Sequence, residues 1–197
     1  MRIVIFLFFS FFFFNSCETE DLMEIDIQFR QFVDQNQLQL NSIIYQNESG
    51  NLYSVERFLY VISDLKLYCE NGETVILDNY YFINLDDESS LKLKNINIPS
   101  SCVSLSFNYG FSQNNNVTNL YLNDGNNFHD LMLWPTTLGG GYHYMKLEGK
   151  YLDDYGVQKF YNTHTGALHG NDYSINYNFD IASADENSCI YVDMNIN

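Results

Sequence analysis

Apolar and polar residues alternate with a period of two along much of this chain. The alternation is clearest in residues 25–29, 103–109, 173–179 and 190–194. Because successive side chains of a β-strand point to opposite faces, each segment is predicted to be a strand with one buried face. Short strands separated by Asn, Gly and Ser predict an all-β single domain, an antiparallel β-sandwich or barrel-like sheet with long loops.

A hairpin and one ambiguous segment precede the middle of the chain. Residues 65–69 and 74–77 alternate and are separated by Asn71-Gly72, a dipeptide typical of tight reversing turns, so a β-hairpin is predicted. Residues 55–62 are mostly apolar. They suit either a short helix or a strand buried on both faces.

Two segments do not alternate. Residues 112–130 are rich in Asn, and residues 155–172 carry His164 and His169. Both are predicted to be long loops, the first of them exposed. Long loops on a rigid β scaffold commonly carry binding residues, so both are candidate binding regions.

The chain begins with a short apolar segment. Arg2 precedes an apolar run over residues 3–14, which ends shortly before Cys17. The run is too short to span a bilayer as a helix. It resembles a bacterial lipoprotein signal peptide, with residues 1–16 removed and Cys17 acylated, and an ordinary secretory signal is the alternative.

Acidic residues follow this cysteine, at Glu18, Glu20 and Asp21. Residues 17–23 resemble the acidic tether that directs lipoproteins of Bacteroidota to the cell surface. The predicted location is therefore the outer membrane, where the protein is lipid-anchored and surface-exposed and contacts the membrane through its anchor only.

The chain is strongly acidic, with 25 Asp and Glu against 9 Lys and Arg and a formal net charge of −16. A surface of this sign repels polyanions, which argues against nucleic acid and anionic lipid as partners, whereas cations and neutral polymers fit. Residues 24–197 have the length of one domain with a sizeable core.

Three cysteines remain after Cys17, namely Cys69, Cys102 and Cys189. In a compartment that permits disulfides, one pair and one free thiol is the simplest arrangement. The sequence does not choose the pair. No two of them have a spacing such as C-x-x-C, which argues against a structural zinc site.

The only tryptophan, Trp134, opens an unusual segment. Pro135 and three consecutive glycines at 139–141 follow it, and then a strand-like run over residues 142–149. The glycines predict a bend whose geometry matters more than local stability, and a long surface loop is the alternative. In a strand over residues 142–149, His143 is predicted to share a face with Met145 and Leu147.

The four histidines, His129, His143, His164 and His169, all lie in this part of the chain, near Met132. Neutral imidazoles beside thioethers suit a soft or borderline metal such as copper. The four histidines and Met132 are therefore candidate metal ligands. The alternatives are exposed loop histidines and, for His143, a hydrogen-bonded core residue.

Motifs of known enzyme classes are missing from the sequence. It contains no G-x-S-x-G, no H-E-x-x-H and no phosphate-binding glycine loop followed by Lys. The acid pairs Asp86-Asp87 and Asp153-Asp154 lie in turn-rich contexts, where carboxylates are more often solvated than catalytic or calcium-binding. A non-enzymatic protein is predicted.

Several stretches carry a family resemblance. Met132-Leu133-Trp134 and residues 141–149 resemble the M-x-W…G-Y-x-F-x-K-x-E-G signature of the MbnP family. Residues 53–65, 107–110 and 160–166 are similar to its Y-x-V-x-x-L-x-Y-Y-I-S-N-I, F-x-I-G and F-x-x-H-x-G motifs, respectively. The resemblance covers most of residues 24–196, in the order of the family.

The resemblance implies a secreted or lipid-anchored β-sandwich protein that binds copper. In some members a tryptophan is oxidised to kynurenine by a partner di-haem enzyme of the cytochrome c peroxidase type. It implies Trp134, His164 and His143 as site residues, of which the first two fall on motif positions and His143 on a variable one. Thr136 stands where members commonly carry a second tryptophan.

Two other functions are compatible with the sequence. A surface interaction module could bind glycan or an envelope protein through Tyr- and Trp-rich loops, with Trp134 as a stacking platform. Alternatively, the family resemblance reports the fold alone.

Overall fold

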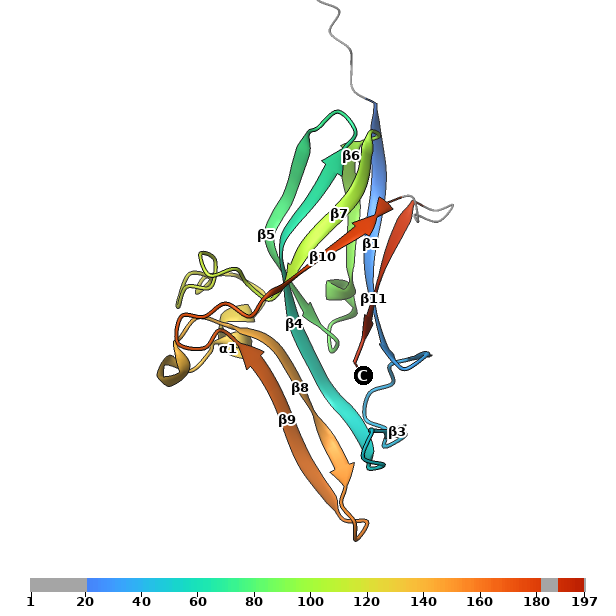
Figure 1. The fold of residues 1–197 in the computed structure, drawn as a ribbon, viewed down its shortest axis with the longest axis vertical. Helices are drawn as coiled ribbons and strands as arrows, with labels where there is room; N and C mark the ends of the chain where they lie inside the picture. The colour runs from blue at the N-terminus through green and yellow to red at the C-terminus, as the bar shows by residue number, and fades with distance from the viewer. Residues whose placement is uncertain (1–20, 182–187, 197) are drawn as a thin grey trace, which may run out of the picture.

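A computed structural model describes residues 21–181 and 188–196 (Figure 1). The predicted signal peptide, Cys17 and most of the tether lie outside these residues. Within the described ranges, no helix has the length and apolar character needed to cross a bilayer. The elements in chain order are β1 (Leu22–Val33), β2 (Asn36–Gln37), β3 (Tyr45–Gln46), β4 (Leu52–Cys69), β5 (Thr74–Asn84), η1 (Glu88–Leu91), β6 (Lys92–Pro99), β7 (Cys102–Tyr109), α1 (Phe128–Met132), η2 (Thr136–Leu138), β8 (His143–Leu152), β9 (Gln158–Gly166), β10 (Ile175–Asp180) and β11 (Cys189–Asn195).

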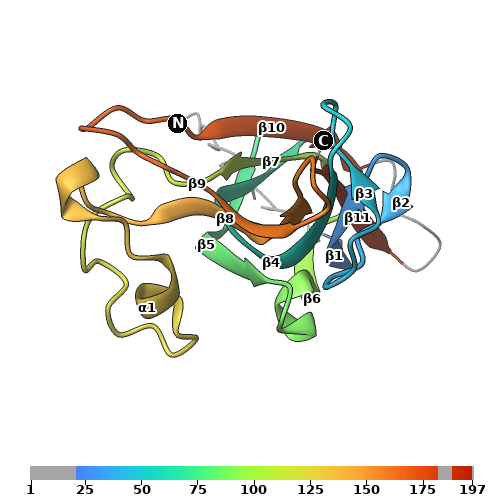
Figure 2. The ribbon, with the colours of Figure 1, turned by 90° about the horizontal axis from the view of Figure 1, so that it is seen from below.

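The strands form two sheets that curl into a half-barrel, which confirms the predicted all-β single domain. The larger sheet has the order β10-β7-β4-β8-β9, with β3 and β5 also paired to β4; the smaller has β1 between β11 and β2, with β6 also paired to β1. Figure 2 shows β9, β8, β4 and β5 along one curved surface. The strands pair antiparallel except β1 and β11, which are parallel.

The main core fills the space between the two sheets. It takes alternate residues from β1, namely Ile25, Ile27 and Phe29, as the period of two predicts. From β4 it takes Phe58 and Tyr60, together with other apolar residues of that strand. The predicted one-sided burial of β1 is therefore confirmed.

Residues 55–62 belong to β4, so the strand alternative is correct and the helix alternative is wrong. The intervening residues Leu59 and Val61 are also fully buried, but they belong to a second cluster on the opposite face of the strand. A strand covered on both faces needs apolar residues at consecutive positions, so residues 55–62 show no alternation of apolar and polar residues.

The segment after β7 covers that second face. Phe128 of α1 stacks on Tyr142 with ring centroids 4.9 Å apart, and Tyr121 stacks on Phe111 at 5.2 Å. Tyr121 and Phe128 are buried, so the prediction that residues 112–130 are an exposed loop is wrong at these positions. Aromatic burial against β4 folds the polar segment onto the sheet.

Residues 158–166 form β9, so the prediction of one long loop over residues 155–172 is also wrong. The strand pairs antiparallel with β8, and His164 lies opposite Lys146. As an edge strand it exposes most of its side chains, which explains its polar composition. Its strand conformation depends on pairing with β8, because its own sequence shows no apolar alternation.

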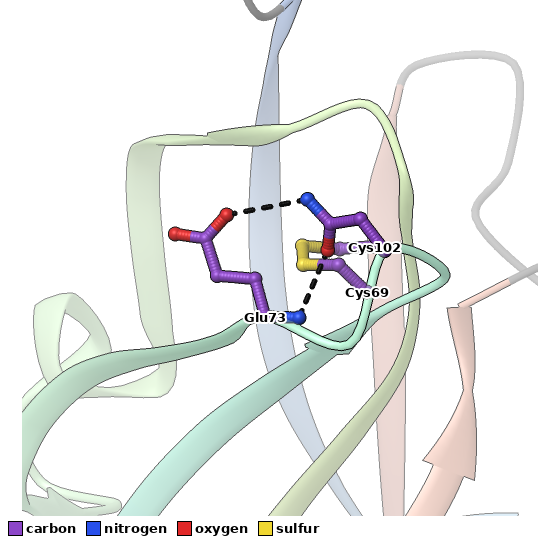
Figure 3. The surroundings of a disulfide bond; sticks show 4 residues. Cys69, Glu73 and Cys102 are labelled. Carbon is purple, nitrogen blue, oxygen red and sulfur yellow. Dashed lines mark hydrogen bonds between the residues drawn. A yellow bond between two sulfur atoms is a disulfide. The ribbon is translucent and has the colours of Figure 1, made fainter.

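The predicted hairpin joins β4 to β5, with Tyr68 opposite Thr74. Next to its turn, Cys69 of β4 forms a disulfide with Cys102 of β7 (Figure 3). Cys189 is buried outside this bridge. Among the three cysteines that the structure describes, the prediction of one disulfide is therefore confirmed, and its partners are determined.

Candidate functional site

The segment around Trp134 forms a closed bend between α1 and β8. The Trp134 amide donates a hydrogen bond to the Gly141 carbonyl over 2.9 Å, and Leu133 pairs with Tyr142. All three glycines at 139–141 have positive φ, which only glycine adopts readily. The predicted bend is confirmed, and it places the indole beside the first residues of β8 and the end of β9.

Trp134 is an inward-facing side chain, with 8% of its surface exposed. Its ring meets that of His143 edge to face, with centroids 4.5 Å apart. A Cβ atom built on Gly166 would lie 3.0 Å from indole Cδ2, so the glycine allows the close approach. The indole is not an exposed stacking platform, and its Nε1–H is buried without a hydrogen-bond partner.

His143 is buried and holds a fixed orientation. Its Nδ1 lies 3.0 Å from the Met132 carbonyl oxygen. A carbonyl can only accept, so Nδ1 carries the hydrogen and the lone pair of the neutral ring is on Nε2. Burial lowers the pKa of His143 to about 4, which keeps the ring neutral at neutral pH.

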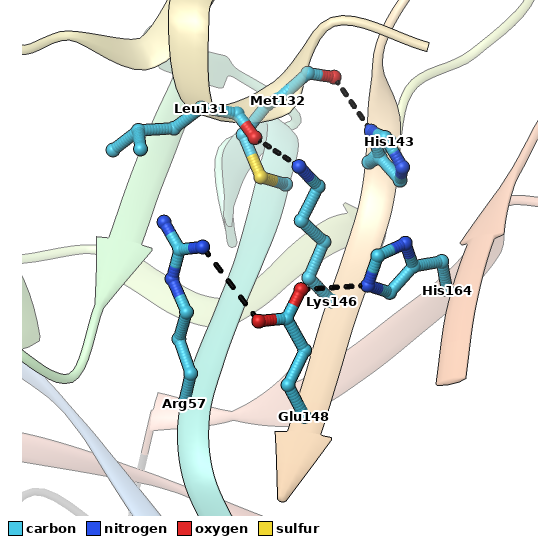
Figure 4. A network of polar contacts seen from close by, with 7 residues as sticks. All are labelled: Arg57, Leu131, Met132, His143, Lys146, Glu148 and His164. Carbon is cyan, nitrogen blue, oxygen red and sulfur yellow. Dashed lines mark hydrogen bonds and ion pairs between the residues drawn. The ribbon is translucent and has the colours of Figure 1, made fainter. Parts of the chain in front are cut away.

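His164 of β9 faces His143, with ring centroids 5.1 Å apart and planes nearly perpendicular. Its Nε2 lies 2.8 Å from Glu148 Oε1. A carboxylate oxygen accepts, so Nε2 carries the hydrogen and Nδ1 has the lone pair in the neutral ring. In Figure 4 the second nitrogen of each ring is on the side turned toward the other ring.

A β-bulge creates this arrangement. In the pairing of β8 with β9, Gly166 lies opposite His143 and Thr165 lies opposite Met145, so the register shifts between them. Met145 and Leu147 pack against the main core, whereas His143 contacts Trp134 and His164. The prediction that His143 shares a face with Met145 and Leu147 is wrong, because a bulge redirects side chains.

Two cations complete the polar network. Lys146 Nζ donates to the Leu131 carbonyl, so Lys146 and His143 together bind the last turn of α1 (Figure 4). Burial lowers the pKa of Lys146. Arg57 of β4 lies 3.7 Å from the second carboxylate oxygen of Glu148. Strand β8 therefore contacts the end of α1, and Arg57 of β4 forms an ion pair with Glu148, the carboxylate that orients His164.

The other predicted ligands are placed elsewhere. His129 Nδ1 lies 3.0 Å from the Tyr142 hydroxyl, and His169 is an exposed turn residue. The Met132 side chain is fully buried in the second cluster, and its carbonyl contacts His143. Of the five candidate ligands, the structure thus brings only His143 and His164 into ring contact with each other.

Sequence reasoning named no role for Glu148, Lys146 or Arg57. The K-x-E spacing places Lys146 and Glu148 on one face of β8, and the pairing places His164 on the same face. Alternation along β8 could have identified the first two. It could not have identified Arg57, which reaches the carboxylate from β4.

The donor set fits a metal that accepts few nitrogen ligands. Among residues 21–181 and 188–196, no group of three or more His, Cys, Asp or Glu side chains is placed to hold a metal ion. Two imidazoles, with a buried indole beside that of His143, are what the site offers. Imidazole suits copper, and this pair would hold it through His143 Nε2 and His164 Nδ1.

Burial of His143 makes stability depend on pH. In the unfolded chain its imidazole titrates near 6.5, while in the folded protein the pKa is about 4. Below pH 6.5 the unfolded state therefore binds a proton that the folded state does not. The free energy of unfolding should fall as pH drops toward 4, by up to about 3 kcal/mol from this group.

Urea unfolding between these pH values would measure the loss, with His143→Gln as the comparison. The variant cannot titrate at this position, so its stability should change less with pH. Equal pH dependence in the two proteins would show that His143 does not cause it.

Comparisons with known proteins concern the family and the fold of this chain. A family model described as MbnP matches residues 23–197. Among solved structures, the chain is similar to MbnP from Methylosinus trichosporium, with a TM-score of 0.54 and 8% sequence identity. That match covers 81% of this chain and 71% of the other, and at this identity it concerns the fold. A search of curated proteins gives no match.

Proposed function

This chain belongs to the MbnP family, and on that premise we propose that it binds copper between His143 and His164. Family membership suggests a copper-related role. The observation that carries the proposal is the pair of facing imidazoles, 5.1 Å apart, whose other nitrogens are both held by hydrogen bonds. Metal-binding histidines are commonly oriented in this way, because a hydrogen bond at one ring nitrogen fixes the tautomer and leaves the other nitrogen for the metal.

Copper suits the chemistry of the pair better than harder cations do. Imidazole nitrogen is a borderline donor that binds copper well, whereas magnesium and calcium favour oxygen ligands. The low pKa of His143 means that protons compete weakly for its nitrogen above about pH 5. The net charge of −16 also attracts a cation to the surface.

Trp134 supports a second part of the proposal. Its indole nitrogen is buried without a partner, and its ring lies 4.5 Å from that of His143. Oxidation to kynurenine, as in some family members, would replace the indole by an aryl amine and a ketone at this position. A di-haem enzyme of the cytochrome c peroxidase type is the proposed partner for this oxidation.

The proposed cellular setting follows from the beginning of the chain. We place the protein at the outer membrane, lipid-anchored through Cys17 and exposed at the surface, where it would acquire or hold copper without catalysing a reaction. Globomycin treatment of the native host should then cause the unprocessed precursor to accumulate, whereas an ordinary secretory signal would be cleaved as before.

A competition titration tests copper binding. Protein expressed from Glu18 onward is titrated with Cu(I) and Cu(II) against a chelator of known affinity. We expect one copper per chain with a dissociation constant of about 1 μM or below. His164→Ala should weaken binding by about 100-fold, because one of two imidazole ligands is lost.

His169→Asn is the matched control. This histidine is exposed at a φ of 48°, which Asn tolerates, so the variant should fold and bind copper as the parent does. Unchanged stoichiometry and affinity in His164→Ala would contradict the ligand assignment. Intact mass of protein from the native host would show whether Trp134 is modified.

A further inference from the structure

Glu148 occupies a central place in the polar network of the site. Its Oε1 accepts from His164 Nε2 over 2.8 Å, and its Oε2 lies 3.7 Å from Arg57 Nη1. The strand register explains the placement, because Glu148 lies opposite Arg57 on β4 and one diagonal step from His164 on β9. One carboxylate thus connects three strands at the site.

We infer that Glu148 is a positioning residue for copper: it holds the Nε2–H of His164 and thereby leaves Nδ1 as the nitrogen that meets the metal. This inference rests on the proposed function. An imidazole without such a partner exchanges between two tautomers and rotates about its χ angles. The hydrogen bond removes both freedoms before copper arrives, so less ordering is required on binding.

Each of the two histidines is oriented by a hydrogen bond at one ring nitrogen. His143 is held by the main-chain carbonyl of Met132, which no substitution removes, whereas His164 is held by a side chain that can be changed. Arg57 lies within ion-pair distance of the other carboxylate oxygen, at 3.7 Å. His164 is therefore the half of the pair whose orientation can be tested directly.

The alternative is an ordinary surface ion pair. The side chains of His164 and Glu148 are 29% and 25% exposed, and pairs of this kind contribute little to stability. Breaking a purely structural pair would leave copper affinity unchanged. The two interpretations therefore predict different results for the same substitution.

Two variants separate the hydrogen bond from the charge. Glu148→Ala removes both, whereas Glu148→Gln keeps a carbonyl oxygen that can accept the Nε2–H. We expect about 10- to 100-fold weaker copper binding for Glu148→Ala and a smaller loss for Glu148→Gln. Glu56→Ala is the control, because Glu56 forms a similarly exposed pair with Lys150 over 2.7 Å, away from the histidines.

The tautomer is measured by nitrogen NMR of histidine side chains in copper-free protein at about pH 8, where imidazoles are neutral. Wild-type and Glu148→Gln proteins should show His164 protonated on Nε2, and Glu148→Ala should show a mixture. Copper titration of the same samples then gives the affinities. The copper-free measurement does not depend on whether the metal binds.

The outcomes are distinguishable. If the wild type binds copper but carries the hydrogen on Nδ1 of His164, the inference is overturned. Unchanged copper affinity in Glu148→Ala overturns it as well, and leaves the copper site standing. If the wild type shows the expected tautomer but binds no copper, the proposed function fails and the role of Glu148 fails with it.

Discussion

Replacing Gly149 with alanine is expected to lower the free energy of unfolding by about 4 kcal/mol, more than ordinary overpacking costs. A Cβ atom at this position would lie 2.0 Å from the main-chain oxygen of Ser54 and 2.8 Å from the ring of Tyr161. The first contact is with the backbone of β4, which cannot rotate away as a side chain can. Relief therefore requires the central strand to move.

The surroundings of Gly149 make that movement costly. Gly149 lies opposite Val55 of β4 and Tyr161 of β9, so it is paired on both sides. Tyr161 crosses over it and donates its hydroxyl to the Ser54 carbonyl over 2.9 Å. Separating β4 from β8 would break this bond together with ladder hydrogen bonds.

Urea unfolding of Gly149→Ala, compared with Gly125→Ala, measures the effect. A Cβ on Gly125 would meet nothing within 4 Å, so that variant should stay within about 0.5 kcal/mol of the parent. Similar stability of the two variants would mean that β4 and β8 are not as close at Gly149 as the structure has them.

Removing the disulfide is expected to cost about 3 to 4 kcal/mol. The bridge joins Cys69 to Cys102, which are 33 positions apart, and so restricts a long loop in the unfolded chain. Both cysteines are buried at the strand ends of the main core, so serine at these positions also loses packing. The double variant with Cys69→Ser and Cys102→Ser is the one to measure.

Reduction of the parent protein provides the matched comparison. With excess dithiothreitol, its unfolding midpoint should fall to near that of the double variant, and the variant should not respond. Copper affinity of the folded variant should be unchanged, because the bridge lies at the far end of β4 from the segment that pairs with β8. A parent protein that is insensitive to reduction would contradict this account.

The candidate site was partly predictable. Trp134 and His164 fall on motif positions that mark them as site residues, whereas the sequence predicted no role for Lys146 and Glu148, although the same motif contains them. The strand that carries His164 could not be predicted in the same way, because β9 has an exposed, polar composition that is typical of a loop. Its strand character depends on hydrogen bonds to β8, which single-segment patterns do not contain.

By itself, the sequence determined the local properties of this protein: which segments become half-buried strands, where the hairpin turns, that the glycines form a bend, and that one disulfide forms. These follow from side-chain alternation, backbone freedom and cysteine number, each a property of neighbouring residues or of composition. Only the tertiary structure decided which cysteines pair, that aromatic residues of an Asn-rich segment cover the second face of β4, and that a bulge turns His143 toward His164. Those outcomes depend on contacts between residues far apart in the chain, and their energies exist only once the sheets have assembled.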